Sequence, residues 1–306
     1  MVPLRSKVAG VLIAFLGGIW TALPAGTATA LAADLVVPQG GVGKVEVTIQ
    51  PDDSAPWGSF LGRTVYFRRE EARRFSALVG VDIDAPVGPH PMKVMVIRDG
   101  ANRELARPTV QVKDGGFGTQ ELTLPKDQVD LDLPTLTRVN REQSQVNHLW
   151  RSGAHKAMWN GPWRMPVEGR IMHSFGFRRV INGEPRSPHN GEDIAAPTGT
   201  PVVAPNDGVA RLTGERFFGG NTVFLEHGGG LFTFYMHLSD IQVRDGQAVK
   251  QGDVIGRVGQ SGRATGPHLH WGGRLNDARI NPIRLVEPEP VVVVGGGEPA
   301  GGGLGE

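Results

Sequence analysis

The chain has 306 residues, with 44 glycines, 23 prolines, 39% hydrophobic residues and no cysteine. Its formal charge is +1, from 32 basic and 31 acidic side chains, so no global field draws it to nucleic acid or to an anionic surface. The lack of cysteine excludes disulfides and cysteine-rich structural zinc sites. This composition predicts loop-rich, mostly β structure in about two domains, each long enough for its own core.

Residues 1–33 have the three parts of a secretory signal peptide. Two basic residues begin the segment, an apolar run over 8–23 follows, and small residues close it. We expect cleavage after Ala32 or Ala33, a periplasmic or secreted protein, and no stable membrane span after cleavage. The alternative is an uncleaved membrane anchor, for which the apolar run is barely long enough.

Residues 34–124 contain short segments of alternating polarity that Pro, Gly and Asp separate. This spacing fits a β-sandwich, and we predict an immunoglobulin-like module. Asp84 to His90 is predicted to be a turn, and the lone His90 beside two prolines is not a metal ligand. The predicted strands are Gly43–Ile49, Arg63–Phe67, Phe75–Ile83 and Met92–Ile97.

Residues 125–162 form a predicted polar connector with one helix. Val and Leu recur at helix-like intervals among polar residues between Thr137 and Trp150. Three tryptophans are expected to pack the two domains together: Trp150, Trp159 and Trp163.

Residues 163–286 are a predicted domain of antiparallel sheet with one buried face, and 287–306 a predicted flexible, disordered tail. The alternative for part of this tail is an edge strand at Val291–Val294. Asn182-Gly183 is a hairpin-turn signal. His237 is expected just past a strand. The predicted strands are Val202–Pro205, Gly208–Leu212, Asn221–His227 and Leu231–Tyr235.

Five side chains of this domain carry the chemistry. His268 and His270 flank one residue, so on a strand they project to the same face. His189 and Asp193 are four apart, and the prolines that follow exclude a helix, so a loop running into a strand presents them. Two neutral imidazoles and a carboxylate are the protein ligands of a catalytic zinc ion. We assign His189, Asp193 and His270 as ligands of one Zn²⁺ and leave His237 and His268 to carry protons, a division that spacing alone does not decide.

These motifs, together with Phe175-Gly-Phe-Arg178, resemble the lysostaphin/LytM-type zinc endopeptidases of bacterial cell walls. The resemblance covers residues 163–285, and its four elements occur in the family's order. It implies the same three zinc ligands and makes His237 and His268 the catalytic pair. Met236 departs from the small residue that the family often has at this position, which could alter the wall of the substrate groove.

The resemblance implies an exported zinc-dependent endopeptidase that hydrolyses peptide bonds in peptidoglycan cross-links or stems. The alternative is a non-catalytic protein that binds peptidoglycan and activates cell-wall amidases, and the complete set of five site residues argues against it. We expect His268 to take a proton from water and His237 to stabilise the oxyanion or protonate the leaving amine. Arg178 and Tyr235 are the predicted substrate contacts, with a structural ion pair as the alternative for Arg178. Expected partners are peptidoglycan and cell-wall regulatory proteins, but not nucleic acid.

Overall fold

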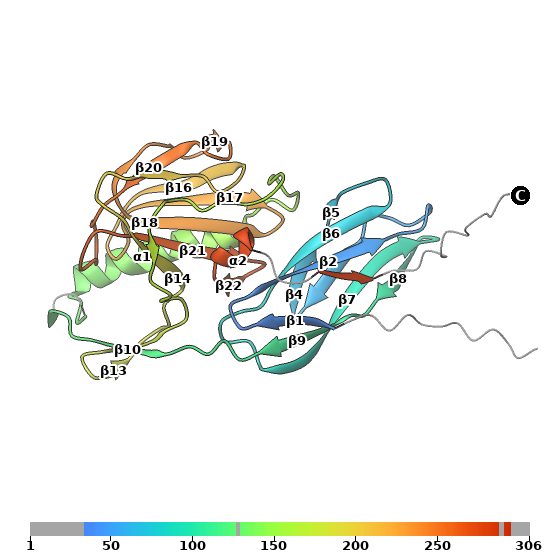
Figure 1. The fold of residues 1–306 in the computed structure, drawn as a ribbon, viewed down its shortest axis with the longest axis horizontal. Helices are drawn as coiled ribbons and strands as arrows, with labels where there is room; N and C mark the ends of the chain where they lie inside the picture. The colour runs from blue at the N-terminus through green and yellow to red at the C-terminus, as the bar shows by residue number, and fades with distance from the viewer. Residues whose placement is uncertain (1–33, 127–128, 288–290, 295–306) are drawn as a thin grey trace, which may run out of the picture. The chain divides into compact units, whose positions relative to one another are not determined.

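The computed structural model describes residues 34–126, 129–287 and 291–294 (Figure 1). Their secondary structure is mostly β with two helices, which confirms the predicted fold class. Neither helix has the length and apolar character that a bilayer span requires. The predicted signal peptide at 1–33 lies outside the described residues.

The first module consists of two sheets around one core of apolar side chains. Its strands are β1 (Leu35–Pro38), β2 (Val42–Thr48), β3 (Trp57–Phe60), β4 (Arg63–Tyr66), β5 (Arg68–Arg69), β6 (Arg74–Gly80), β7 (Gly88–Arg98), β8 (Ala101–Ala106), β9 (Thr109–Lys113) and β23 (Val291–Val294). One sheet has the order β1-β9-β7-β3-β4 with β8 beside β7, and the other has the order β23-β2-β6-β5. Val45 and Val47 of β2 and Val94 and Val96 of β7 are fully buried, whereas the residues between them are partly exposed. The immunoglobulin-like classification stays a prediction.

Two segments of this module differ from the prediction. Val291–Val294 belong to the predicted flexible tail, but they form β23 and pair in parallel with β2. Their β-branched side chains suit a strand, and Val292 and Val294 are buried in the core, so the alternative of an edge strand holds. β7 begins at Gly88, inside the predicted turn. Only β9 pairs with this part of β7, so its prolines, which lack an N–H, interrupt no second ladder.

The second module is built on a ten-stranded sheet. Its strands are β11 (Arg170–Ile171), β14 (Gly191–Ala195), β15 (Pro201–Val203), β16 (Gly208–Arg216), β17 (Gly220–Gly228), β18 (Leu231–Ile241), β19 (Ala248–Val249), β20 (Val254–Val258), β21 (Leu269–Leu275) and β22 (Ala278–Ile280). The main path is β11-β14-β21-β18-β17-β16-β19, and neighbouring strands along it are antiparallel, as predicted. The helix α2 (Ile283–Val286) follows β22.

The two faces of this sheet have different roles. On one face, Val223, Tyr235 and Trp271 are fully buried in the module's main core. The other face carries Phe224 and Phe234, and its apolar part is covered by a helix. The register of the strands therefore decides which side chains enter the core and which remain available for a site.

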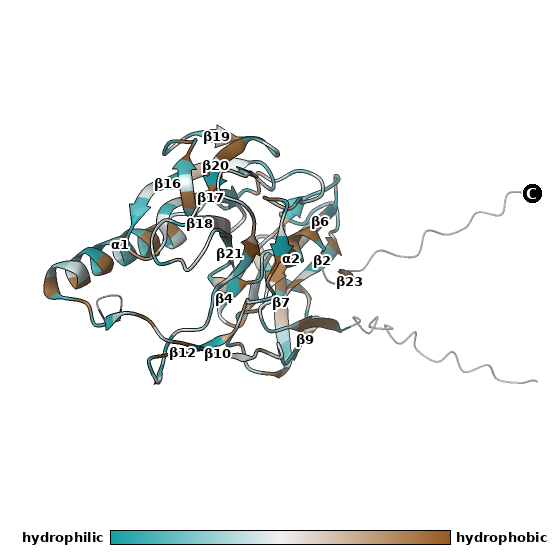
Figure 2. Ribbon diagram, turned by 60° about the vertical axis from the view of Figure 1, so that its left-hand side comes forward, coloured by the Kyte–Doolittle hydropathy of each residue, from teal (hydrophilic) through white to brown (hydrophobic). Residues whose placement is uncertain are grey.

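The covering helix is α1 (Leu133–Arg151), which confirms the helix predicted between Thr137 and Trp150 (Figure 1). Its N-terminus is capped by Asp132, whose carboxylate accepts a hydrogen bond from the Thr135 amide at 2.9 Å. Figure 2 shows both hydrophobic and hydrophilic segments along α1, as an amphipathic helix requires. Trp150 packs edge-on against Phe224 and Phe232, with ring centroids 5.6 and 5.2 Å away.

The tryptophans of the connector pack in two places. Trp150 serves the helix–sheet contact of the second module rather than the contact between modules. Trp159 and Trp163, with ring centroids 6.2 Å apart, pack against a cluster that includes Val42 of the first module and Leu231 of the second. The prediction that tryptophans join the two domains therefore holds for these two alone.

A small three-stranded sheet lies beside the main sheet in sequence, since its strands flank β11 of the main sheet. It consists of β10 (Thr119–Leu122), β12 (Arg178–Ile181) and β13 (Glu184–Pro185). β12 and β13 pair with Ile181 opposite Glu184, so Asn182-Gly183 is a two-residue turn, as predicted. Both turn residues have positive φ, 53° and 83°, which favours Asn-Gly over most other pairs.

A buried histidine in β17 is expected to make stability depend on pH. His227 is 0% exposed, its Nδ1–H donates to the Asp207 carbonyl at 2.8 Å, and burial lowers its pKa to about 4. In the unfolded chain His227 binds a proton with an ordinary pKa near 6.5, whereas in the folded protein it stays neutral down to about pH 4. Neutral His227 therefore costs the folded state nothing above pH 6.5, and the folded state loses stability relative to the unfolded chain as pH falls from 6.5 toward 4. We expect His227 to account for about 2 kcal/mol of lost unfolding free energy between pH 7 and pH 5.

Urea unfolding of the wild type and of His227→Gln at the two pH values tests this expectation. The glutamine side chain does not titrate, so the loss between pH 7 and pH 5 should be smaller by that amount in the variant. Equal losses in the two proteins would contradict the assignment of the pH dependence to His227.

Candidate metal centre

The strand register places the predicted ligands side by side. In the pairing of β14 with β21, Asp193 lies opposite His270, and in the pairing of β21 with β18, His270 lies opposite Met236. These side chains therefore share the sheet face opposite the main core. His189 comes from the loop before β14, as predicted. Its amide donates to the Phe177 carbonyl at 3.0 Å, which ties the loop to the Phe-Gly-Phe-Arg segment.

One atom from each of the three side chains converges on a common point. His189 Nε2 and His270 Nδ1 are 2.9 Å apart, and Asp193 Oδ1 lies 2.9 Å from His270 Nδ1 and 3.3 Å from His189 Nε2. His189 and His270 are only 2% and 6% exposed. The structure thus brings together all three residues that the sequence assigned as ligands, all within 4.8 Å of one another.

Ser174 and Glu192 support this cluster through hydrogen bonds. The His189 Nδ1–H donates to the Ser174 carbonyl at 3.0 Å, so the lone pair of Nε2 faces the cluster. The Ser174 hydroxyl accepts from the Asp193 amide at 3.2 Å, and the Ser174 amide donates to the buried Glu192 carboxylate at 2.7 Å. Sequence reasoning missed Ser174, because a backbone carbonyl leaves no signal in the sequence. The only signal for Glu192 is its place between two ligands.

The protonation states suit a divalent cation. Burial raises the pKa of Asp193, but His189 and His270, when they carry a proton, hydrogen-bond to this carboxylate and attract it, which holds that pKa below its ordinary value. Burial lowers the pKa of His270 to about 4, although the hydrogen bond with Asp193 opposes it. At neutral pH the cluster therefore offers a carboxylate and a neutral imidazole.

The chemistry of the donor set fits zinc. Two imidazole nitrogens and one carboxylate oxygen are the protein ligands of catalytic zinc sites, which keep a further position for solvent or substrate. Three electron-rich atoms this close repel one another unless a proton or a cation lies between them. His189, Asp193 and His270 would hold the ion.

His237 reaches the site through a bulge in β18. Asn221 and Val223 of β17 lie opposite Leu238 and Tyr235, so β18 has one extra residue between these pairs. His237 has a φ of 63°, and its amide donates to the Gly219 carbonyl at 2.8 Å. The prediction that His237 follows the strand is wrong, because the strand continues to Ile241. The bulge turns His237 toward the ligands instead.

His237 and His268 form a matched pair beside the ligands. Their ring centroids are 4.8 Å apart, and His268 Nε2 lies 3.8 Å from Asp193 Oδ1. The Nδ1–H of His237 donates to the Ser261 carbonyl at 2.9 Å, and that of His268 to the Gly266 carbonyl at 2.8 Å. In each neutral ring the proton is therefore on Nδ1, and Nε2 carries a lone pair. Burial lowers the pKa of His237 to about 4, so it is neutral at pH 7.

The two predicted substrate contacts lie elsewhere. Tyr235 is 0% exposed, and its hydroxyl hydrogen-bonds with Thr233 in the main core, so its position does not support a substrate contact. Arg178 donates to Asp84 of the first module at 2.6 Å, which is the structural ion pair considered as its alternative. The bulge in β18 separates Tyr235 from His237, because a regular strand would place both side chains on one face.

The His270 imidazole packs against the backbone of Gly191, where no side chain could fit. Substitution of Gly191 should therefore weaken metal binding. A Cβ at this position would lie 2.5 Å from His270 Nε2 and 2.9 Å from the Trp271 carbonyl. We expect Gly191→Ala to displace the imidazole and lower zinc affinity about 10- to 100-fold, as changes next to metal ligands do. Competition with a chromophoric chelator measures this. Gly266→Ala is the control, because a Cβ there has no neighbour within 4 Å, and comparable losses in both variants would refute the steric argument.

Comparisons with known proteins bear on the same region. The sequence profile of Peptidase family M23 matches residues 187–282. The chain is 43% identical over 124 residues to the DD-carboxypeptidase/endopeptidase Mpg of Neisseria meningitidis, and 46% identical over 128 residues to the peptidoglycan DD-endopeptidase ShyA of Vibrio cholerae. These matches cover 40% and 41% of this chain but only 29% and 30% of those relatives.

A solved structure extends the likeness beyond the site. A crystal structure from Pseudomonas aeruginosa assigned to peptidase M23 superimposes with a TM-score of 0.62 and 35% sequence identity. The match covers 82% of this chain and 94% of that one, so it includes far more than the 96 residues from 187 to 282. The chain therefore belongs to peptidase family M23.

Proposed function

We propose that the protein is an exported zinc-dependent endopeptidase that hydrolyses peptide bonds of peptidoglycan. The observation that carries this proposal is the convergence of His189, Asp193 and His270, with His237 and His268 beside them. A bound zinc ion would supply a Lewis acid that polarises the scissile carbonyl and lowers the pKa of water. No nucleophilic side chain is needed for such a hydrolysis.

The two other histidines have the form that proton transfer requires. Because each Nδ1–H is held by a backbone carbonyl, each Nε2 can accept a proton. His268 is the better placed general base, since its Nε2 lies 3.8 Å from Asp193 Oδ1, next to the metal ligands. His237 acts after the attack of water: it stabilises the oxyanion or delivers a proton to the leaving amine.

Family membership and the relatives support the substrate class. Two matched relatives carry the names peptidoglycan DD-endopeptidase and DD-carboxypeptidase/endopeptidase, and the family profile spans all five site residues. The signal peptide predicted at 1–33 agrees with a substrate outside the cytoplasm. We infer a periplasmic or secreted enzyme, with peptidoglycan as its principal partner and one Zn²⁺ as its cofactor.

Digestion of purified sacculi tests the proposal. The full chain, loaded with zinc, should release soluble fragments with newly formed amino termini, which mass spectrometry identifies together with the bond cut. A chelator should stop the release, and added zinc should restore it. Release of fragments that is unchanged by the chelator, or none from zinc-loaded protein, would overturn the proposal.

A further inference from the structure

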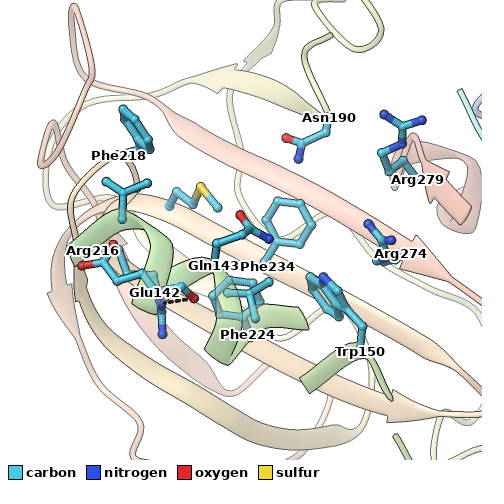
Figure 3. A pocket seen from close by; sticks show the side chains of 15 residues that line it. Glu142, Gln143, Trp150, Asn190, Arg216, Phe218, Phe224, Phe234, Arg274 and Arg279 are labelled. Carbon is cyan, nitrogen blue, oxygen red and sulfur yellow. Dashed lines mark hydrogen bonds between the residues drawn. The ribbon is translucent and has the colours of Figure 1, made fainter. Parts of the chain in front are cut away.

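A cavity of about 210 Å³ lies between α1 and the sheet, on the face that carries the metal ligands (Figure 3). Aromatic rings form much of its wall, and Figure 3 shows Phe224, Phe234 and Trp150 gathered there. Val146 of α1 and Met236 of β18 also line it. These side chains offer an apolar lining suited to the hydrocarbon part of a ligand.

The cavity adjoins the catalytic centre. Asn190, which follows the ligand His189, lines it, and so does Gly219, whose carbonyl accepts from the His237 amide. The Phe234 ring centroid lies 5.9 Å from that of the ligand His270. A substrate bound at the metal centre therefore has a neighbouring space for one of its branches.

A buried cation without a counter-ion lines the cavity. Arg216, at the end of β16, is 9% exposed. Its Nη1 and Nη2 reach the Glu142 carbonyl and Gln145 Oε1 at 3.4 and 3.5 Å, which are long for hydrogen bonds, and its Nε is buried without a partner. Among the described residues, no carboxylate lies within ion-pair distance of this guanidinium. A buried charge left in this way is costly unless a ligand neutralises it.

The other charges around the cavity are already paired. Arg274 donates to Asp277, and Arg279 donates to Asp82 and Asp84. Glu142 also lines the cavity, but its two carboxylate oxygens already accept from Arg138 at 2.7 Å and from the Phe217 amide at 3.0 Å. Arg216 is thus the cation of the cavity that retains capacity for an anion.

We propose that this cavity binds a branch of the peptide substrate that has an aliphatic stem and ends in a carboxylate, with Arg216 as the residue that recognises the carboxylate. The aromatic wall accommodates the stem, and the guanidinium pairs with the anion. The proposal rests on the proposed function, since it assigns a specificity site to the same hydrolysis. Arg216 would then select acidic peptides over their neutral counterparts.

The test compares soluble peptidoglycan fragments whose carboxylates are free with the same fragments after conversion to carboxamides. For the zinc-loaded full chain we expect kcat/KM to be at least about tenfold higher on the free acids, mainly through a lower KM. Arg216→Gln should bring the acid-to-amide ratio close to one, and Arg216→Lys should retain part of it. Arg244→Gln is the matched control, because Arg244 is exposed outside the cavity and its loss removes the same charge.

A binding measurement separates this proposal from the proposed function. Titration calorimetry of the zinc-free full chain should show at least about tenfold weaker binding of the free acids after Arg216→Gln. If wild-type protein binds the acids through Arg216 but hydrolyses nothing, the proposed function fails and the cavity assignment stands.

An acid-to-amide ratio of one in the wild type, or a wild-type ratio in folded Arg216→Gln, would overturn the assignment. Circular dichroism and the melting temperature establish folding. If Arg216→Gln does not fold, the wild-type ratio and Arg216→Lys decide.

Discussion

Replacement of His270 by alanine should abolish zinc retention and lower peptidoglycan hydrolysis at least about 10³-fold. His270 Nδ1 is 2.9 Å from both His189 Nε2 and Asp193 Oδ1, so its loss removes the central one of three ligand atoms. Two remaining ligands bind a divalent ion far more weakly than three do. Plasma emission spectrometry of the dialysed protein measures the zinc content and checks the first part of the prediction. The initial rate of fragment release from sacculi checks the second part.

The control for this prediction is His90→Ala. His90 is in β7 of the first module, where its side chain hydrogen-bonds with the Pro86 carbonyl at 2.8 Å. That variant should retain one zinc ion per chain and the wild-type rate. Full zinc content in the His270 variant would remove His270 from the ligand set, and retained hydrolysis without zinc would remove the metal from the reaction.

Replacement of His268 by alanine should spare zinc and lower kcat by about 10²- to 10⁴-fold, the usual contribution of a general acid or base. Its Nδ1–H is bound to Gly266 and its Nε2 is 3.8 Å from Asp193, so it adjoins the metal ligands without belonging to their cluster. His237→Ala should behave in the same way, because its ring is likewise held by a carbonyl next to the site.

The double variant lacking both His237 and His268 distinguishes a working pair from two independent contributions. If the two rings act in one reaction cycle, the double loss should be smaller than the product of the single losses. Loss of zinc from either single variant would show that its histidine supports the metal rather than the chemistry.

Much of the metal centre could be predicted because its chemistry and its geometry are both local in the sequence. The alternation of strand side chains places His268 and His270 together, and only a few residue types can bind zinc. The convergence of Asp193 with His270 depends on the pairing of β14 with β21, and the sequence indicated it only through the ligand set that the resemblance implied. The fold class, the connector helix and the Asn-Gly turn were predicted from equally local patterns.

The errors arise where tertiary structure overrides a local pattern. No glycine or proline marks the bulge that separates the face of Tyr235 from that of His237, so the burial of Tyr235 in the core, away from the substrate side, has no sign in the sequence. The support of His189 by the Ser174 carbonyl belongs to the backbone and has no residue signature. Arg216 was not singled out at all, because its burial depends on a helix more than 60 residues earlier in the chain.

The pairing of β23 with β2 has a consequence for synthesis and for truncation. The sheet that contains β2 is completed by Val291–Val294, so a nascent chain cannot close this sheet until residues more than 240 positions after β2 have left the ribosome. In a fragment that ends after the peptidase module, β2 would keep its pairing with β6, but its other edge would be unpaired and the buried places of Val292 and Val294 would be empty. Such an open strand is a template for self-association, so C-terminally shortened forms of this protein should be prone to aggregate.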